Sequence, residues 1–412
     1  MKKVYIFLIA LFLVNGAMAQ WVPQNSGTTK NLNSVCFTDA NTGYACGDSG
    51  VILKTADGGT NWILQNWGTR YSLTTVHFPK ADTGYIEGDC DVSLKTTNGG
   101  LIWINLQIYP CLAMGWRCTL PLTSSVYFTD VSTGFQAYSV QCGRPSTYSR
   151  SISKTTDGGI NWIPIYNENG IGSGVFSSVF FSDRDRGYVV GSIGTILKTI
   201  DGGANWSNQN SGTYNQLNSV YFTDESTGYA VGGSGTILKT TNGGVNWITL
   251  NSGTTAELNS VFFSDENLGY TVGNGGIILK TTDGGINWVT ECSGTTSSLH
   301  SVYFPSIDTG YIVGDCGIIL KSTNGGYPVG INNMSLKSRI IKIYPIPASS
   351  QITVSTTNKG SIAILSQNGQ ELIISQITEP KTQIDITNLP SGVYFVRMTG
   401  DSAVQVGKFV KQ

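Results

Sequence analysis

A repeated turn carries the first residues in this sequence that could do chemistry. The motif "KTTDGGINW", residues 280–288, occurs seven times with small changes. An Asp or Asn precedes its Gly-Gly pair in each copy: Asp57, Asn98, Asp157, Asp201, Asn242, Asp283 and Asn324. A carboxylate there could ligate calcium, but an Asp or Asn at one fixed turn position is typical of a cap on backbone N–H groups. We therefore predict a structural role for these residues. The same prediction covers the "FTD" aspartates in the turn before the Thr-Gly pair: Asp39, Asp130 and Asp224.

Histidine and lysine give no sign of a catalytic or cofactor site. His77 and His300 replace the Tyr, Phe or Asn of other copies, and neither has a Ser or Cys nucleophile in a recognisable setting. A zinc site would need several clustered ligands. The "ILKT" lysines follow the nearest glycine at a distance, as Lys198 follows Gly194, whereas a phosphate loop places Gly-Lys-Ser/Thr together. We expect no metal, no cofactor and no nucleotide.

Arginine is too sparse for a sialidase. Such an enzyme needs three arginines that converge on a carboxylate, with a Tyr nucleophile and its Glu. The repeat region holds six arginines, namely Arg70, Arg117, Arg144, Arg150, Arg184 and Arg186, and no Arg-Ile-Pro motif. We expect a protein that is not an enzyme. The alternative, a glycan-active hydrolase, would require two facing carboxyl groups about 5 Å apart for retaining chemistry.

The period of the repeat indicates which elements position these residues. The seven markers lie 41, 59, 44, 41, 41 and 41 residues apart. One period, residues 217–254, contains four β-rich runs that are separated by Gly, Asn, Asp or Ser. Four short antiparallel strands per period are typical of a propeller blade, which must stack on its neighbours to bury both faces. The sequence predicts an all-β fold with a seven-bladed β-propeller over residues 20–330.

Tryptophans indicate how the ring closes. A tryptophan follows the Gly-Gly pair in six copies: Trp62, Trp103, Trp162, Trp206, Trp247 and Trp288. The last copy lacks one, but "WVPQNSGTT" from Trp21 matches "NWITLNSGTT" from Asn246. We predict that the N-terminal segment supplies the outer strand of the last blade, because a closed ring leaves no unpaired edge.

The long interval between Asn98 and Asp157 holds 18 extra residues, and we expect them in two loops on one face of the ring. In a four-stranded blade, the loop between strands 2 and 3 and the loop to the next blade lie at the same end. Aromatic residues and arginines, which are enriched at recognition sites, gather there: Trp67, Arg70, Tyr71, Tyr109, Trp116, Arg117, Tyr138, Arg144 and Tyr148. They are either a ligand-binding surface or only the filling of long loops.

These motifs carry a family resemblance. "TTDGGINW" resembles the Asp-box of sialidase-like propellers, with Asn161, Asn205, Asn246 and Asn287 where that family usually has Thr. The whole unit, with "TGYAVG" and "ILKTTDGG", resembles the repeat of the photosystem II assembly/stability factor family, a seven-bladed group. The resemblance implies the fold, and it suggests a further function, assembly of an envelope complex.

The pattern changes after Gly330. Residues 331–339 read as a linker, and residues 340–412 contain strand-like runs that predict a small immunoglobulin-like β-sandwich. "IKIYPIPAS" and "LPSGVYFVRMTGDSAVQVGKFVK" resemble the type A C-terminal sorting domain of the type IX secretion system, apart from Ile346 where Asn is commoner. The resemblance implies recognition by the type IX machinery, passage across the outer membrane, removal of this domain, and release or attachment to the cell surface.

The N-terminus and the net charge restrict location and partners. Lys2 and Lys3, an apolar run and Ala17-Met18-Ala19 predict a signal peptide over residues 1–19 and export through the periplasm. No later segment approaches the roughly 20 apolar residues of a membrane-spanning helix. Lys and Arg number 25 against 26 Asp and Glu, so no basic surplus favours nucleic acid.

Eight cysteines in an exported chain suggest disulfides. Cys292 and Cys316 are 24 residues apart, as are Cys118 and Cys142, and we predict both bonds on the rim that carries the insertions. Cys90 and Cys111 then remain as a third pair. Cys36 and Cys46 either face each other across the first hairpin or stay as free, buried thiols.

The sequence thus predicts a secreted or surface-attached propeller that acts as a non-catalytic binding or adhesion module for a glycan or protein ligand. The candidate ligand-binding residues are those of the insertion-bearing rim. The hydrolase and the envelope assembly factor remain the alternatives.

Overall fold

The computed structural model describes residues 21–65, 67–90, 92–106, 122–142, 147–170, 174–325, 342–355, 360–366, 370–377, 379, 381–399 and 404–412. The chain divides into two compact units, residues 1–329 and 330–412. The predicted signal peptide, residues 1–19, and the predicted linker, residues 331–339, lie outside the described residues.

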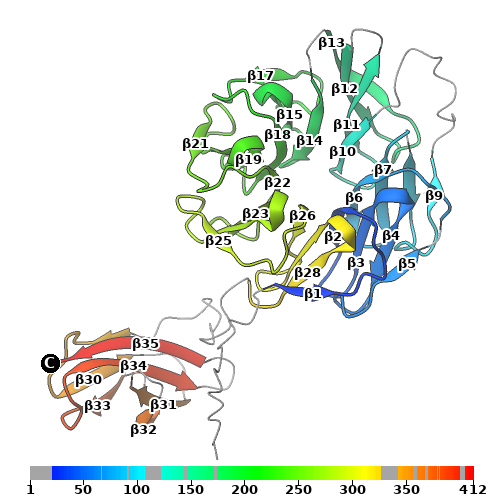
Figure 1. Ribbon diagram of the computed structural model, residues 1–412. Helices are drawn as coiled ribbons and strands as arrows, with labels where there is room; N and C mark the ends of the chain where they lie inside the picture. The colour runs from blue at the N-terminus through cyan, green and yellow to red at the C-terminus, as the bar shows by residue number, and fades with distance from the viewer. Residues whose placement is uncertain are drawn as a thin grey trace, which may run out of the picture. The chain divides into compact units, whose positions relative to one another are not determined.

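The described residues of the first unit form seven four-stranded antiparallel sheets (Figure 1). The first three sheets are β2–β5 (Leu32–Phe37, Gly43–Gly47, Ile52–Thr55, Ile63–Gln65), β6–β9 (Leu73–Lys80, Thr83–Gly88, Ser93–Thr96, Ile104–Asn105) and β10–β13 (Leu122–Phe128, Gly134–Cys142, Thr147–Thr155, Ile163–Gly170). The next three are β14–β17 (Phe176–Phe181, Gly187–Gly191, Ile196–Thr199, Ser207–Gln209), β18–β21 (Leu217–Phe222, Gly228–Gly232, Ile237–Thr240, Ile248–Leu250) and β22–β25 (Leu258–Phe263, Gly269–Gly273, Ile278–Thr281, Val289–Glu291). The last combines β26–β28 (Leu299–Tyr303, Gly310–Gly314, Ile319–Ser322) with β1 (Val22–Gln24).

The seven sheets form a closed ring. The first strand of each sheet contacts the first strand of the next, from β2 through β6, β10, β14, β18, β22 and β26 back to β2. These first strands surround the centre of the ring (Figure 1). The prediction of an all-β propeller is confirmed.

The N-terminal segment closes the ring as predicted. Strand β1 pairs antiparallel with β28, with Val22 opposite Lys321 and Gln24 opposite Ile319. Trp21, directly before β1, is fully buried. Strand β1 therefore covers the outer edge that the C-terminal repeat would otherwise expose.

Aromatic residues of the repeat fill the interfaces between sheets. Tyr229 of "TGYAVG" stacks on Phe263 of the next sheet at 3.9 Å between ring centroids, and Trp288 meets Phe263 edge-on at 6.0 Å. The glycines of the turn make room for this packing. Gly285 has a φ of +82°, and a Cβ atom there would lie 2.9 Å from the ring of Tyr229. The Gly-Gly pair is thus required both by the backbone and by the neighbouring sheet.

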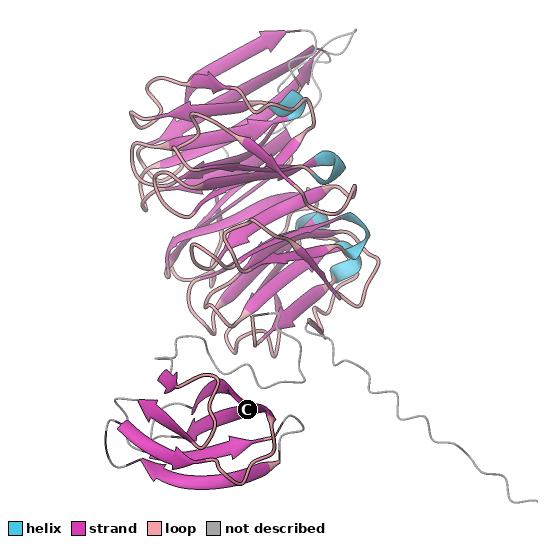
Figure 2. Cartoon of the chain, turned by 90° about the vertical axis from the view of Figure 1, so that its left-hand side faces the viewer, coloured by secondary structure: helices cyan, strands magenta, loops and turns pink. Residues whose placement is uncertain are grey.

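The two ends of the ring carry different turns. Strands 2 and 3 of five sheets are joined by 3₁₀ turns, which lie on one side of the ring in Figure 2: η1 (Asp48–Gly50), η3 (Ser192–Gly194), η4 (Gly233–Gly235), η5 (Asn274–Gly276) and η6 (Asp315–Gly317). These turns meet the loops that leave strand 4, since Gly194 N–H donates to Asn215 O at 2.9 Å. The Asp-box turns instead meet the loops between strands 1 and 2, since Gly58 N–H donates to Asn41 O at 2.8 Å. We call these the η end and the Asp-box end.

The third sheet differs from the others in the length of its strands. Strands β11 and β12 have nine residues each, where β19 and β20 have five and four. The expectation that the extra residues before Lys154 form a loop was wrong in this respect, because most of them lengthen a paired hairpin. Backbone groups in a ladder bond to each other and need no other partner. Residues 107–121 and 143–146 lie outside the described residues.

The second unit contains two antiparallel sheets. One has the order β29-β30-β33 (Lys342–Tyr344, Gln351–Ser355, Lys381–Asp385), and the other β32-β31-β34-β35 (Glu371–Ile377, Gly360–Leu365, Gly392–Thr399, Val404–Lys411). Ile352, Ile364, Val396 and Phe409 are buried in its core.

Candidate functional site

The Asp-box aspartates are turn caps, as predicted. In the sixth sheet, Asp283 Oδ1 accepts the Thr281 hydroxyl at 2.8 Å and the Asn287 N–H at 2.9 Å. Asp283 Oδ2 accepts the side-chain amide of Asn287 at 2.8 Å, which explains the Asn where the Asp-box family usually has Thr. The Asn287 N–H is also the main reason that the pKa of Asp283 lies below its usual range. Asp224 likewise accepts the N–H groups of Ser226 and Thr227, so the structural prediction for the "FTD" aspartates is confirmed.

The "ILKT" lysines join neighbouring sheets. Lys239 Nζ and the Tyr229 hydroxyl both donate to Gly284 O of the next sheet, at 2.6 and 2.7 Å. The ammonium group also lies 5.4 Å from the centroid of the Tyr229 ring. The same contact closes the ring, where Lys321 Nζ donates to Gly58 O at 2.6 Å. Sequence reasoning rejected a phosphate-loop role for these lysines but missed this one. Its signal was the constant spacing of Tyr, Lys and Gly-Gly in six of the seven copies.

The two histidines have local partners. His77 Nε2 lies 3.1 Å from Phe128 O, and burial lowers the pKa of His77 to about 4, so the ring is neutral. His300 Nε2 lies 2.7 Å from Asp315 Oδ1 at the η end. Among the described residues, no group of three or more His, Cys, Asp or Glu side chains is placed to hold a metal ion.

Cys36 and Cys46, for which the sequence left a disulfide and free thiols open, are both free. Cys36 pairs with Tyr44 and Cys46 pairs with Ser34, so the two cysteines are offset by two residues along the strands and do not face each other. Burial raises the pKa of the Cys36 thiol to about 12. Of the two open readings for this pair, the structure has free, buried thiols.

The predicted Cys292–Cys316 bond is absent from the structure, in which both thiols are free. A Cβ atom on Gly276 would meet Ser293 and Thr295, one and three residues after Cys292. Cys316 instead sits in the turn of the last sheet, where its N–H donates to Asn31 Oδ1 at 3.0 Å. Both thiols are exposed and unpaired. Cys111, Cys118 and the side chain of Cys142 lie outside the described residues, so the Cys90–Cys111 and Cys118–Cys142 bonds stay predictions.

The predicted ligand-binding residues differ in their exposure and position. Trp67 is half-buried, and its Nε1 donates to Gly50 O at 3.3 Å, so it anchors its loop to the first sheet. Arg70 and Tyr71 are exposed at the η end, Tyr71 by 46%. Tyr138 lies in β11. Outside the described residues lie Tyr109, Trp116, Arg117 and Arg144, together with the side chain of Tyr148.

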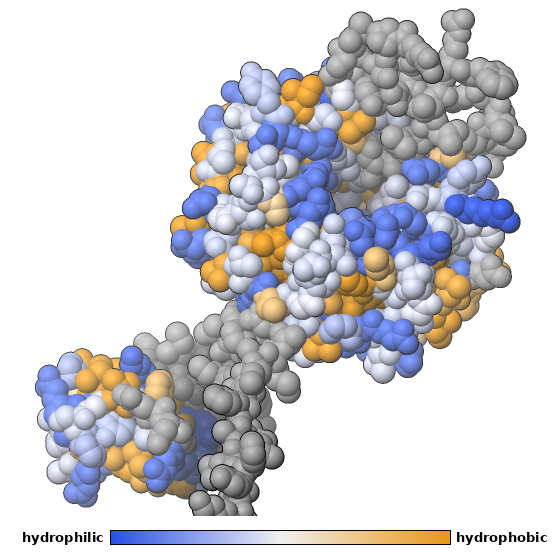
Figure 3. Space-filling view, viewed as in Figure 1, coloured by the Kyte–Doolittle hydropathy of each residue, from blue (hydrophilic) through white to orange (hydrophobic). Residues whose placement is uncertain are grey.

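Two carboxyl groups near the centre of the η end were missed. Asp48 Oδ1 accepts the Ser72 hydroxyl at 2.6 Å and the side-chain amide of Asn33, on the innermost strand β2, at 3.1 Å. Asp89 follows β7 in the next sheet, and burial, with a smaller contribution from the charge of Asp48, raises its pKa. Figure 3 shows hydrophilic residues around the centre of this end. The sequence analysis did not find the pair, because the residue at this turn position varies between copies: Asp48, Asp89, Ser192, Gly233, Asn274 and Asp315.

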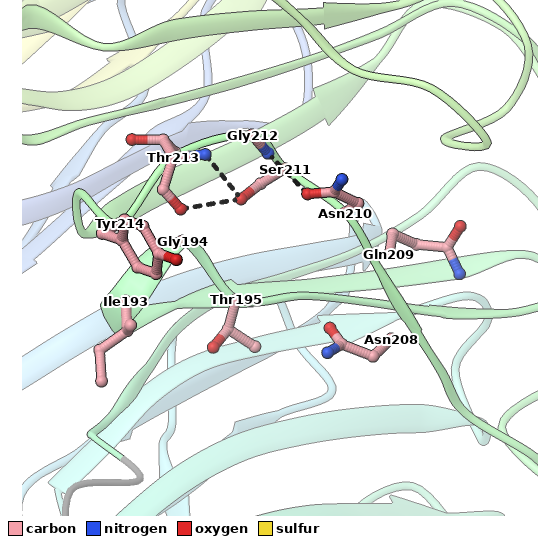
Figure 4. Close-up of a pocket in the computed structure, with 10 residues that line it drawn as sticks. All are labelled: Ile193, Gly194, Thr195, Asn208, Gln209, Asn210, Ser211, Gly212, Thr213 and Tyr214. Carbon is pink, nitrogen blue, oxygen red and sulfur yellow. Dashed lines mark hydrogen bonds between the residues drawn. The ribbon is translucent and has the colours of Figure 1, made fainter.

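An open pocket of about 550 Å³ lies at the η end of the fourth sheet. Its walls are turn η3, strand β17 and the loop from Asn210 to Tyr214 (Figure 4). Sequence reasoning missed it, although Ile193 stands where two other copies have Ser and Tyr214 where three other copies have Thr. None of the described residues that line it is charged.

These features define a class: a rigid β-propeller in which the recurring Asp and Lys side chains serve packing, with polar groups open at one end. Sequence models agree with this class and assign the family. The model of the photosynthesis system II assembly factor YCF48 matches residues 14–115, 171–253, 205–290 and 245–371, together more than half of the chain. The chain therefore belongs to the YCF48 family.

The C-terminal unit has its own family match. Residues 342–412 match the secretion system C-terminal sorting domain. This match supports export by the type IX secretion system and a secreted or outer-surface location. In the described part of the chain, no helix is both long and apolar enough to span a membrane.

Solved structures support the fold. The chain is similar to YCF48 bound to D1 peptide, with a TM-score of 0.60 and 22% identity over 74% of this chain and 97% of the other. It is similar to YCF48 from Cyanidioschyzon merolae, with a TM-score of 0.59 and 20% identity over 73% and 98%. A GH74 enzyme from Niastella koreensis gives a TM-score of 0.58 and 13% identity over 95% and 69%. No curated protein matches the sequence.

Proposed function

We propose that this protein is an exported, non-catalytic binding module whose propeller holds a glycan or protein ligand at its η end. The observation that carries the proposal is that exposed side chains without a role in the repeat are found at the η end. The Asp-box aspartates and the "ILKT" lysines are engaged in turns and between sheets, as Asp283 and Lys239 show. Exposed residues that depart from the repeat, such as Arg70 and Tyr214, lie at the η end.

The scaffold suits recognition. Loops on a paired, closed frame keep their positions, so a ligand gains contacts without ordering the protein. A related propeller has been solved with D1 peptide bound, which supports a protein ligand for this fold. The sorting domain adds the destination. It directs the chain to the type IX machinery and is then removed, and the propeller is released or attached to the cell surface.

The test is a binding screen with the purified full chain against glycans and outer-surface proteins. A first variant, Arg70→Ala with Tyr71→Ala, changes the η end. A control variant, Arg184→Ala with Arg186→Ala, changes the Asp-box end, where Arg184 pairs with Asp130 at 3.2 Å. We expect ligands that the first variant binds more weakly and the control binds normally. Weaker binding by the control variant, with normal binding by the first variant, would contradict the assignment of the binding face to the η end.

A second candidate function, a glycan-active hydrolase, is favoured by one observation. Asp48 and Asp89 lie in adjacent sheets, and the raised pKa of Asp89 suits a general acid. Asp89→Asn should then abolish release of reducing sugar from neutral polysaccharides while leaving the melting temperature unchanged. Equal turnover by the parent and by Asp89→Asn, or none by either, would exclude this candidate.

Membership of the YCF48 family supports one more role, as an assembly factor for a complex of the cell envelope. Capture of a membrane complex by the tagged chain in its host would favour that role over adhesion.

A further inference from the structure

The pocket of the fourth sheet departs from the repeat at three places that meet in space. Its turn has Ile193 where η1, η4 and η5 have Ser49, Ser234 and Gly275. Its exit loop has Tyr214 where other copies have Thr29, Thr255 and Thr296. Its outer strand β17 reads Ser-Asn-Gln where β21 reads Ile-Thr-Leu. Residues 193 and 208–214 are brought together by the pairing of β16 with β17 and by the bond from Gly194 N–H to Asn215 O.

Ile193 holds a strained backbone conformation. Its φ is +56°, in the left-handed region, and it is the only β-branched residue among the described residues with positive φ. A β-branched side chain is strained in this region, because its Cβ branches crowd the backbone. Burial of the side chain does not compensate for this strain, since the side chain is 53% exposed. Such uncompensated strain is typical of ligand sites, because packing gives no reason to retain it.

Tyr214 supplies an unused aromatic face beside Ile193. It is 89% exposed, whereas the recurring tyrosines of the repeat, such as Tyr229, are fully buried. Figure 4 shows Tyr214 and Ile193 at one side of the pocket and Asn208 and Gln209 at the other, with Thr195 between them.

The opposite side offers amide groups. Asn208 and Asn210 are exposed, whereas the side-chain amide of Gln209 donates to Ser207 O and Ser207 Oγ at 3.3 and 2.9 Å. Asn210 Oδ1 accepts the Gly212 N–H at 3.1 Å, but none of the hydrogen bonds drawn in Figure 4 engages the amide of Asn208. Each amide has an acceptor oxygen and two N–H donors, which matches hydroxyl groups that both donate and accept.

The wall between the two sides is fixed from the neighbouring sheet. Arg150 of the lengthened strand β12 donates from Nη1 to Thr195 Oγ1 at 3.0 Å. Glu168 neutralises this guanidinium at 2.8 Å, and the Phe176 ring lies 4.9 Å from it. The pocket is therefore rigid without presenting a charge, and the longer third sheet acquires a role in shaping it.

From this geometry we propose that the pocket is a subsite for an uncharged sugar unit. Tyr214 and Ile193 contact the apolar face of the sugar ring, and Asn208 and Asn210 bind its hydroxyl groups. The volume of about 550 Å³ lies within the range of roughly 300–1,000 Å³ of small-ligand pockets. A peptide is less suited, because β17 offers only three residues as an edge for an added strand. The inference rests on the proposed binding function and names its ligand class.

The test uses the purified full chain with cellotetraose, xylotetraose and mannotetraose, and with tetragalacturonate as the anionic comparison. Calorimetry measures affinity, and amide hydrogen exchange reports protection of residues 207–214. We expect at least one neutral tetrasaccharide to bind and to protect this segment. Tyr214→Ala and Asn208→Ala should weaken binding at least about tenfold, as expected of a central contact, and Tyr214→Phe should retain it.

Matched controls lie in the fifth sheet, where Thr255 and Thr249 occupy the positions of Tyr214 and Asn208. Thr255→Ala and Thr249→Ala should leave affinity unchanged. Ile193→Ser, which installs the residue of turns η1 and η4, should raise the melting temperature and weaken sugar binding together. A structural role alone would not give this opposite pair of effects.

Two results would overturn the proposal and leave the binding function intact. One is a sugar that binds equally well to Tyr214→Ala and to the parent. The other is a protein or peptide ligand at the η end with no binding of any neutral tetrasaccharide. Binding of neither sugars nor proteins would reject both the subsite and the proposed function.

Discussion

Replacement of Trp21 by Ala should open the propeller ring. Trp21 is fully buried and meets Tyr270 and Phe304 edge-on, at 6.1 and 5.9 Å between ring centroids. Its Nε1 donates to Glu291 Oε2 at 3.2 Å. Because β1 has only three residues, this side chain is the main anchor of the closing strand.

The structure sets the size of the effect. Deletion of a buried Trp side chain costs about 3–5 kcal/mol, and loss of a donor to a buried carboxylate adds about 1–3 kcal/mol. Domain stabilities are about 5–15 kcal/mol, so the loss is a large fraction of the total. At about 2–4 °C per kcal/mol, we expect the melting temperature to fall by roughly 10 °C or more.

Thermal unfolding by circular dichroism measures the loss, and amide hydrogen exchange locates it. Trp247→Ala is the matched control. Trp247 is also buried, but the strand next to it, β21, directly follows β20 of the same sheet in the chain. Its Nε1 has no partner among the described residues. Trp21→Ala should expose β28 to exchange, whereas Trp247→Ala should leave β20 protected. Equal melting of Trp21→Ala and the parent, with β28 still protected, would refute closure by β1.

Burial raises the pKa of Glu291 from 4.5 to about 7. Between these two pH values the folded state binds a proton that the unfolded state lacks. The free energy of unfolding should therefore fall as pH rises, by up to about 1.4 kcal/mol per pH unit. Urea unfolding at several pH values should show this slope, and Glu291→Gln should remove it; an unchanged slope would contradict the assignment to Glu291. Lys239→Met removes the 2.6 Å bond to Gly284 O and should cost about 1–2 kcal/mol in urea unfolding, whereas the control Lys80→Met at an exposed pair should cost under about 0.5 kcal/mol. A chain that ends at residue 330 should fold but remain in the periplasm of its host, and its appearance outside the cell would reject the sorting role of residues 342–412. Iodoacetamide should modify Cys292 and Cys316 in the native protein but reach Cys36 and Cys46 only after unfolding, because the latter are buried and their pKa values are raised. Recovery of a Cys292–Cys316 peptide without reduction would contradict this pattern.

Local patterns in the sequence determined the propeller and its closure. The strands, the turns and the capping role of Asp283 follow from the period and the turn chemistry, because each depends on a few consecutive residues. The closing strand was predictable because the segment after Trp21 repeats "NSGTT" from the fifth sheet. The sorting unit was recognised from "IKIYPIPAS" and the last residues of the chain for the same reason.

Only the tertiary structure decided which parts of neighbouring copies touch. The period gives the spacing of Cys292 and Cys316, but whether the two thiols meet depends on the packing of neighbouring sheets, and both are free. The bond from Lys239 to Gly284 crosses between sheets, and no local pattern specifies that crossing. The pocket of the fourth sheet depends on β16 pairing with β17, which sets Tyr214 beside Ile193. Side chains far apart in sequence meet through packing, and packing depends on the positions of the elements in space.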